Sequence, residues 1–176
     1  MKKLFTEIPF LKGKRIIIKQ IEDKDADNLI KLTENPKVYR YLPTFLFEKK
    51  YRDMHVVISK LYTECIKESL ILGIYLNDSI CGLIEMYGHR DEIHKVSVGY
   101  RLIEQYWGMG IATEALSLLV KYLYDETDIE IITASTMVEN RASANVLNKN
   151  GFTKVVSGVG EDWGYDLPKI VDKWIR

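Results

Sequence analysis

The stretch GYRLIEQYWGMGIATEAL, residues 99–116, carries the strongest structural signal in the chain. Its pattern predicts the end of a strand, a turn with two glycines and the first turns of an amphipathic helix. Gly108 and Gly110 lack a Cβ atom, so the turn can adopt positive φ and approach a ligand closely. The free N–H groups of the turn and of the helix N-terminus, together with the helix dipole, favour an anion there. No Lys or Arg lies between Glu104 and Thr113, so the turn predicts a phosphate site built mainly from main-chain donors.

The composition is typical of one globular domain. The chain has 176 residues, with 25 basic and 25 acidic side chains, and no linker or repeat divides it, so we expect a single domain over residues 1–176. The neutral charge gives no reason to expect a nucleic acid or a membrane as partner. The start, MKKLFTEIPF, lacks the apolar run of a signal peptide. Cys65 and Cys81 are too far apart for a zinc or redox motif. We therefore expect a cytoplasmic protein without a metal.

The order of predicted elements indicates an α+β fold. Strands are expected at 15–21, 69–76, 80–87, 94–102, 129–137, 152–157 and 169–174, and helices at 23–33, 54–65, 113–124 and 140–150. Residues 35–45 are expected to form an aromatic-rich loop. This order predicts a mixed, mostly antiparallel sheet of six to seven strands flanked by about four helices. The glycine turn falls where the antiparallel meander ends and the parallel part begins, a position that ligands favour.

Two blocks of sequence carry a family resemblance. Residues 105–110, QYWGMG, resemble the Gln/Arg-x-x-Gly-x-Gly/Ala motif with which the GNAT superfamily of N-acetyltransferases binds acyl-coenzyme A. The longer pattern from Gly99 to Ala115 is similar to the ribosomal-protein N-acetyltransferase branch. Residues 140–152, NRASANVLNKNGF, resemble that branch's Asn-x-x-Ser…Leu-x-x-x-Gly-Phe motif, and 36–43 resemble the loop between its first two helices. The two blocks lie at the separation expected for the family, and the element order agrees along nearly the whole chain.

The resemblance implies that acetyl-coenzyme A is the co-substrate and that two strands splay apart around its acyl group. The end of the strand at 94–102 would hydrogen-bond the pantetheine arm, the turn amides would hold the diphosphate, and the helix at 140–150 would contact the cofactor from the other side. The implied binding residues are Val98, Tyr100, Leu102, Gln105, Tyr106, Trp107, Gly108, Met109, Gly110, Ile111, Ala112, Thr113, Asn140 and Ser143. Asn140 is equally suited to act as a plain helix N-cap.

The residues that transfer protons are less clearly marked. An amine must be neutral to attack, which at pH 7 costs about 1.4 kcal/mol for an α-amine and roughly 4.6 for a Lys side chain. His94, placed at a strand start, has a side chain suited to accept a proton at neutral pH. Glu85 interrupts the apolar run ICGLIEMY, which is unusual unless it faces a wet cleft. Solvent is a third candidate base, and both side chains could instead be plain surface residues. The resemblance implies Ser143 as a proton donor. Some members of the superfamily use a Tyr as the general acid, and Leu147 occupies that position in this sequence.

Aromatic residues are candidates for the wall of the acceptor site, although core packing claims most aromatics. They are Tyr39, Tyr41, Phe45, Phe47, Trp163 and Tyr165. A metal site could be imagined from His89, Asp91, Glu92 and His94. A polar hairpin turn accounts better for this cluster of polar residues.

Three functions remain. The first is direct acetyl transfer from acetyl-coenzyme A to a primary amine, either a small molecule or a protein N-terminus, by a monomer or homodimer. The second is a non-catalytic acyl-coenzyme-A sensor. The third is a dinucleotide-binding oxidoreductase that would use Gly108 and Gly110. Two observations argue against it: the third glycine of the Gly-x-Gly-x-x-Gly motif would fall at Thr113, and Glu130, the candidate ribose-binding carboxylate, lies at the start of its strand and not at the end.

Overall fold

The computed structural model describes residues 2–44, 46, 48, 51, 53–61 and 69–176. Its strands are β1 (Leu11–Lys12), β2 (Ile16–Lys19), β3 (Ser69–Leu76), β4 (Ser79–Arg90), β5 (Lys95–Leu102), β6 (Ile131–Met137), β7 (Thr153–Glu161) and β8 (Lys169–Ile175). Its helices are α1 (Ala26–Thr33), α2 (Pro36–Tyr39), α3 (Met54–Val56), α5 (Ile111–Glu126) and α6 (Arg141–Lys149), with short helical turns η1 (Asp23–Asp25), η3 (Val57–Leu61), η5 (Asp91–Ile93) and η6 (Glu104–Tyr106). Among these residues no helix is long and apolar enough to cross a bilayer.

The described strands form one eight-stranded sheet in the order β1-β2-β3-β4-β5-β6-β8-β7. The pair β5–β6 is parallel and the other neighbours are antiparallel. This confirms the predicted α+β class. The additional strand is β1, which at two residues is too short to show a hydrophobic period.

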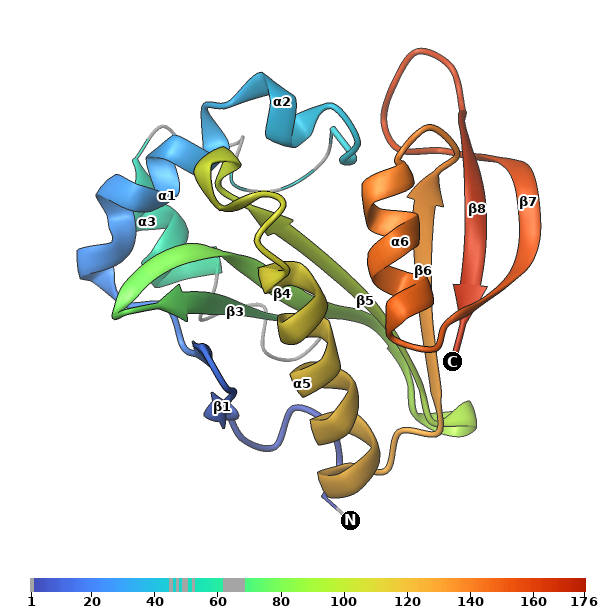
Figure 1. The fold of residues 1–176 in the computed structure, drawn as a ribbon, viewed down its shortest axis with the longest axis horizontal. Helices are drawn as coiled ribbons and strands as arrows, with labels where there is room; N and C mark the ends of the chain where they lie inside the picture. The colour runs from blue at the N-terminus through green and yellow to red at the C-terminus, as the bar shows by residue number, and fades with distance from the viewer. Residues whose placement is uncertain (1, 45, 47, 49–50, 52, 62–68) are drawn as a thin grey trace.

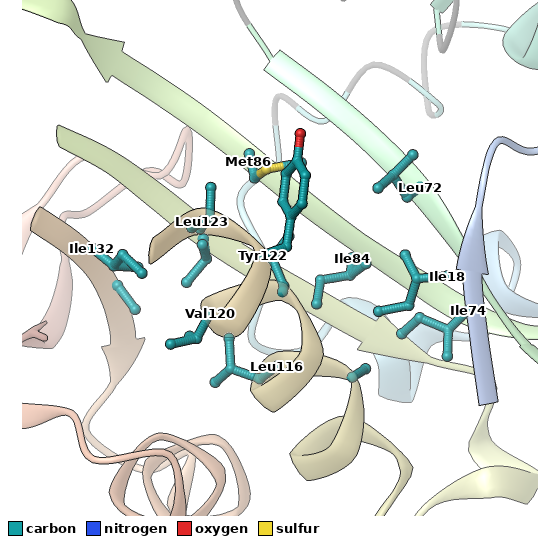
Figure 2. Packing of buried hydrophobic residues seen from close by; sticks show 14 of the residues in the cluster. Ile18, Leu72, Ile74, Ile84, Met86, Leu116, Val120, Tyr122, Leu123 and Ile132 are labelled. Carbon is teal, nitrogen blue, oxygen red and sulfur yellow. The ribbon is translucent and has the colours of Figure 1, made fainter. Parts of the chain in front are cut away.

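The sheet is buried on both faces near its centre. On one face α5 places Leu116, Val120 and Leu123 against Ile84 and Met86 of β4, as Figure 2 shows. On the other face α1 and α3 cover the sheet through a second apolar cluster. Strands buried on both faces read as continuous apolar runs rather than as alternating ones. Glu85 is therefore conspicuous in β4, where most neighbours are fully buried.

Apart from β1 and shifts in where elements begin and end, the structure differs from the predicted elements in three places. The expected loop at 35–45 contains α2, because α1 ends at Thr33 and Asn35 caps a new helix, accepting a hydrogen bond from the Lys37 N–H at 2.9 Å. The helix expected at 54–65 begins at Met54 but continues as the π-helical turn η3, and its later part, with Cys65, lies outside the described residues. His94 is not a strand residue: it adopts a left-handed conformation with φ 48° after η5, and β5 begins one residue later.

Candidate functional site

Strands β5 and β6 separate part-way along their length. They pair through Lys95 with Ile131, Val96 with Ile132 and Ser97 with Thr133, and their pairing stops there. From Val98 onward β5 is bonded to β4, while the rest of β6 is bonded to β8. Figure 1 shows the two strands close together at their N-terminal ends and diverging toward their C-terminal ends. A cavity of about 810 Å³ opens between them, so the strands splay as predicted.

The glycine turn has the predicted backbone. Gly108 and Gly110 both adopt left-handed conformations, with φ 76° and 75°, and Gly110 is the N-cap of α5. The first N–H groups of a helix have no partner within the helix, so those of α5 are directed toward the turn. Gly108 and the residues from Gly110 to Thr113 line the cavity. The cavity thus has main-chain donors and a helix N-terminus at its edge.

Arg15 and Glu114 hold this turn in place, a role that the sequence did not reveal. The Arg15 guanidinium donates to the Met109 carbonyl oxygen at 2.9 Å and to the Glu114 carboxylate at 2.8 Å. Glu114 also accepts a hydrogen bond from the Arg15 backbone N–H at 2.8 Å. Burial acts to raise the pKa of Glu114, but the hydrogen bonds from Arg15 outweigh it and the pKa is lowered. The turn is therefore fastened to the chain that precedes β2 by a charged pair.

Asn140 and Ser143 form the opposite edge of the cavity. The Asn140 side chain caps α6 by accepting from the Ser143 N–H at 3.2 Å, and its amide donates to Ser143 Oγ at 3.1 Å. The Tyr100 hydroxyl of β5 donates to the Ser143 carbonyl oxygen at 3.2 Å. Burial raises the pKa of Tyr100 to about 12, although this hydrogen bond acts to lower it. Tyr100 therefore stays protonated and links the two edges of the cavity.

Glu85 lies in the cavity wall, beside two charged residues that the sequence did not single out. The Arg101 guanidinium lies 3.4 Å from one Glu85 oxygen through Nη1 and 2.7 Å from Glu48 Oε1 through Nη2. The Tyr39 hydroxyl donates to the same Glu48 oxygen at 2.9 Å. Glu85 therefore faces a cleft, as its interruption of an apolar run predicts.

His94 is not brought to the cavity. It precedes the segment in which β5 and β6 still pair, and its Nδ1 lies 3.7 Å from a carboxylate oxygen of Asp128. Its carbonyl oxygen accepts hydrogen bonds from the N–H groups of Glu130 and Ile131 at 2.8 and 3.1 Å. His94 thus holds the start of β6. It does not lie beside the proposed reacting groups, where the sequence placed it.

Most of the other predicted residues meet at the cavity. Its lining includes Val98, Tyr100, Leu102, Tyr106, Trp107, Gly108, Gly110, Ile111, Ala112, Thr113, Asn140 and Ser143. Gln105 and Met109 are exposed and are not part of the lining. Of the aromatic candidates, Tyr41 and Trp163 line the cavity, Tyr39 binds Glu48, and Tyr165 donates to the Leu42 carbonyl oxygen at 2.8 Å. Phe45 and Phe47 lie outside the described residues.

An α+β sheet that splays at a glycine turn defines a fold shared with known acetyltransferases. The family described as Acetyltransferase (GNAT) domain matches residues 15–153. The chain belongs to this family.

Individual relatives agree with the family. "Uncharacterized N-acetyltransferase YoaA" of Bacillus subtilis is 29% identical over 150 residues, which cover 83% of this chain and 84% of the relative. The solved structure of the RimL ribosomal alpha-N-protein acetyltransferase in complex with coenzyme A superposes with a TM-score of 0.81 at 15% identity, covering 96% of this chain and 97% of that one. The microcin self-immunity acetyltransferase MccE, solved with acetyl-CoA and AMP, gives 0.80 at 18% identity and 93% coverage of both chains. The two structural likenesses concern the fold.

Proposed function

We propose that the protein transfers the acetyl group of acetyl-coenzyme A to a primary amine by direct attack within a ternary complex. The observation that carries this proposal is the cavity at the splay of β5 and β6, which has a glycine turn at one edge and a carboxylate in its wall. A strand edge without a partner can hydrogen-bond an extended arm, and a helix N-terminus can hold phosphate. Both features meet in one cavity.

The residues present fit acetyl-coenzyme A. A Cβ atom built on Gly108 meets nothing within 4 Å, so the space above the turn is open to a ligand. The acidic residue nearest the turn on its N-terminal side, Glu104, is occupied by Lys37 and Asn35. A second hollow of about 450 Å³ adjoins the turn and includes the basic residues Lys14, Arg15 and Lys149 in its lining. These features support a diphosphate at the turn and further phosphate beside it.

The reaction requires two proton transfers, and side chains are available to assist both. Bound acetyl-coenzyme A supplies a reactive thioester carbonyl. The Glu85 carboxylate accepts the proton of the attacking amine, directly or through water. Because Ser143 Oγ already accepts a hydrogen bond from Asn140, its own hydrogen remains available to hydrogen-bond the departing thiolate, which takes its proton from solvent. A thiol with a pKa near 8.5 is also a fair leaving group without a donor.

The acceptor end of the cavity favours an amine. Carboxylates at Glu85, Glu161 and Asp162 contribute to its lining, as does the aromatic ring of Trp163. The ring of Tyr41 also lines the cavity, but the Arg40 guanidinium already lies over it. Negative charge attracts an ammonium group, and aromatic faces accept cations. The acceptor class is either a protein N-terminal amine, as the RimL name states for that protein, or a small-molecule amine. An N-terminal α-amine is easier to deprotonate than a Lys side chain.

An amine panel tests the proposal. The purified protein is incubated with acetyl-coenzyme A and either short peptides with free N-termini, the same peptides with blocked N-termini, or small amines, and free thiol is followed. We expect thiol release that depends on the free amine and that falls about 100-fold or more in Glu85→Gln, as expected for loss of a general base. Thermal stabilisation by acetyl-coenzyme A without turnover on any amine would favour the sensor, and stabilisation by NAD would favour the oxidoreductase.

A further inference from the structure

A buried charged cluster lies behind the wall of the cavity. The side chains of Arg101 and Glu48 are 2% and 1% exposed, whereas that of Glu85 is 17% exposed. Two carboxylates thus share one guanidinium, and the more exposed of the two faces the cavity. Burying charged groups is costly unless they are closely paired. A cluster with this cost, placed beside the proposed reacting groups, calls for a function there.

The two carboxylates do not share Arg101 equally. Glu48 forms the closer ion pair, at 2.7 Å from the guanidinium, whereas Glu85 lies at 3.4 Å. Glu48 thereby engages one end of Arg101, and it is itself held by the Tyr39 hydroxyl. If Glu48 carried no charge, Arg101 would attract Glu85 more strongly and draw its carboxylate toward the protein interior. Glu48 therefore leaves Glu85 with oxygen atoms that can take a proton.

Gly99 provides the space that the Glu85 carboxylate occupies. The two residues are directly opposite each other in the β4–β5 pairing. A Cβ atom on Gly99 would lie 2.6 Å from Glu85 Oε1, which is too close for a contact without movement. The φ angle of Gly99 is not among the positive ones, so its backbone does not require glycine. The carboxylate therefore lies against β5 at the point where that strand has left β6.

We infer that Gly99, Arg101 and Glu48 are positioning residues that hold the Glu85 carboxylate at the splay in the orientation needed to accept the amine proton. This inference rests on the proposed function and adds to it the residues on which the efficiency of the proton acceptor depends. Gly99 removes a steric barrier, Arg101 attracts the carboxylate from one side, and Glu48 limits that attraction. Of these four residues, Glu85 is the one that contacts the reacting amine.

Two single variants test the inference. Glu48→Gln keeps the size of the side chain and its hydrogen bonding but removes the charge, and Gly99→Ala adds one methyl group at the carboxylate. We expect kcat to fall about 10- to 100-fold in each, as for a misplaced reacting group, with KM for acetyl-coenzyme A changed less than about twofold. Glu7→Gln, which removes one charge from an exposed pair with Lys2, is the matched control and keeps the wild-type kcat.

Double variants separate a positioning role from a structural one. If Gly99→Ala and Glu48→Gln act through Glu85, then adding either to Glu85→Gln lowers kcat no further, because the group they position is already absent. A crystal structure of Gly99→Ala without ligand provides a readout independent of turnover, and we expect the Glu85 carboxylate to be displaced from β5.

The possible failures are distinguishable. A wild-type protein that releases no thiol with any amine contradicts the proposed function itself. A wild-type protein that turns over, with single variants of wild-type kcat or double variants in which the losses multiply, overturns the inference and leaves the proposed function intact. If Glu48→Gln does not fold, as its thermal unfolding would show, Gly99→Ala with its crystal structure and its double variant decides the question alone.

Discussion

Gly108 shows how much one missing Cβ atom determines at the scale of a residue. Its φ of 76° lies in the region that side chains disfavour, and the space beyond it is empty to 4 Å. Gly158 has nearly the same backbone, with φ 69° and similarly open surroundings, but lies in β7, away from the cavity. The two glycines therefore share their conformational cost and differ in the proposed contact with ligand.

We predict that Gly108→Ala folds but binds acetyl-coenzyme A at least about tenfold more weakly, a loss of about 1.4 kcal/mol, because the new methyl group occupies the space of the diphosphate. Gly158→Ala, the matched control, loses about 1–2 kcal/mol of stability through its left-handed backbone and keeps the wild-type affinity. Calorimetric titration and thermal unfolding of both variants measure these effects. Equal affinities in the two variants would contradict a diphosphate at the turn.

The sequence could predict those site residues whose signal is local. Gly108 and Gly110 stand in a motif, Asn140 precedes a helix, and Glu85 interrupts an apolar run. Arg15 and Glu48 could not be found in this way, because Arg15 meets Glu114 from 99 residues away and Glu48 meets Arg101 only once the sheet has formed. An Arg or Glu in a polar segment has the same local pattern whether it is exposed or buried in an ion pair.

At the scale of elements, β7 is an irregularly paired strand at the edge of the sheet. It lies at the sheet edge, its residues are mostly exposed, and its pairing with β8 is interrupted by two register shifts. The Asp172 carboxylate on β8 holds it there. Asp172 accepts from Lys154 Nζ at 2.8 Å, from Ser157 Oγ at 2.7 Å and from the Gly158 N–H at 3.2 Å. The Lys154 hydrogen bond, followed by that of Ser157, lowers the pKa of Asp172.

We predict that Asp172→Asn destabilises the protein at neutral pH and that its effect shrinks in acid. A carboxylate whose pKa is lowered by folding contributes stability above its unfolded pKa, near 3.9, and loses that contribution as pH falls through the folded pKa. The free energy of unfolding in urea should therefore differ most between wild type and variant at pH 6, and least at the lowest pH at which both still fold. Asp166→Asn, an exposed substitution in the same hairpin, is the control. A difference independent of pH would argue against the ionic role of Asp172.

Elements with a clear apolar run or period were predictable, and those without either were not. The central strands were found as short apolar runs bounded by turn residues, and α5 because its apolar residues recur at helix spacing. The strand β1 has two residues, and the second half of β7, residues 158–161 (GVGE), has one apolar side chain and two glycines. The conformation of His94 depends on the tight turn η5, and a His in a polar segment gives no sign of a left-handed backbone.

At the scale of the whole molecule, three paired residues on each of β5 and β6 join the two parts of the sheet. Further along, the Tyr100 hydroxyl reaches α6, and the Asn150 side chain donates to the Thr113 carbonyl oxygen at 3.2 Å. These side-chain bonds cross the region where the main-chain pairing of β5 with β6 has ended.

We predict that acetyl-coenzyme A slows amide hydrogen exchange at both edges of the cavity together. We expect the amides of residues 98–102 and 111–113 at one edge, and those of 141–143 at the N-terminus of α6 on the opposite edge, to be protected by the same ligand, while those of 153–157 in β7 are unaffected and serve as the internal control. Exchange measured by mass spectrometry with and without ligand checks this, since opening of a segment becomes rarer when a bound molecule must first leave. Protection confined to one edge would contradict a ligand that spans the splay.

Because β5 and β6 pair through three residues each, the two strands are joined at one end and open at the other. Opening at the splay would break few main-chain bonds between β5 and β6, and the hydrogen bonds of Tyr100 and Asn150 connect the two sides beyond the paired residues. A ligand bound between the strands would add further bonds to these. We therefore expect a ligand bound at the splay to make this part of the sheet more rigid.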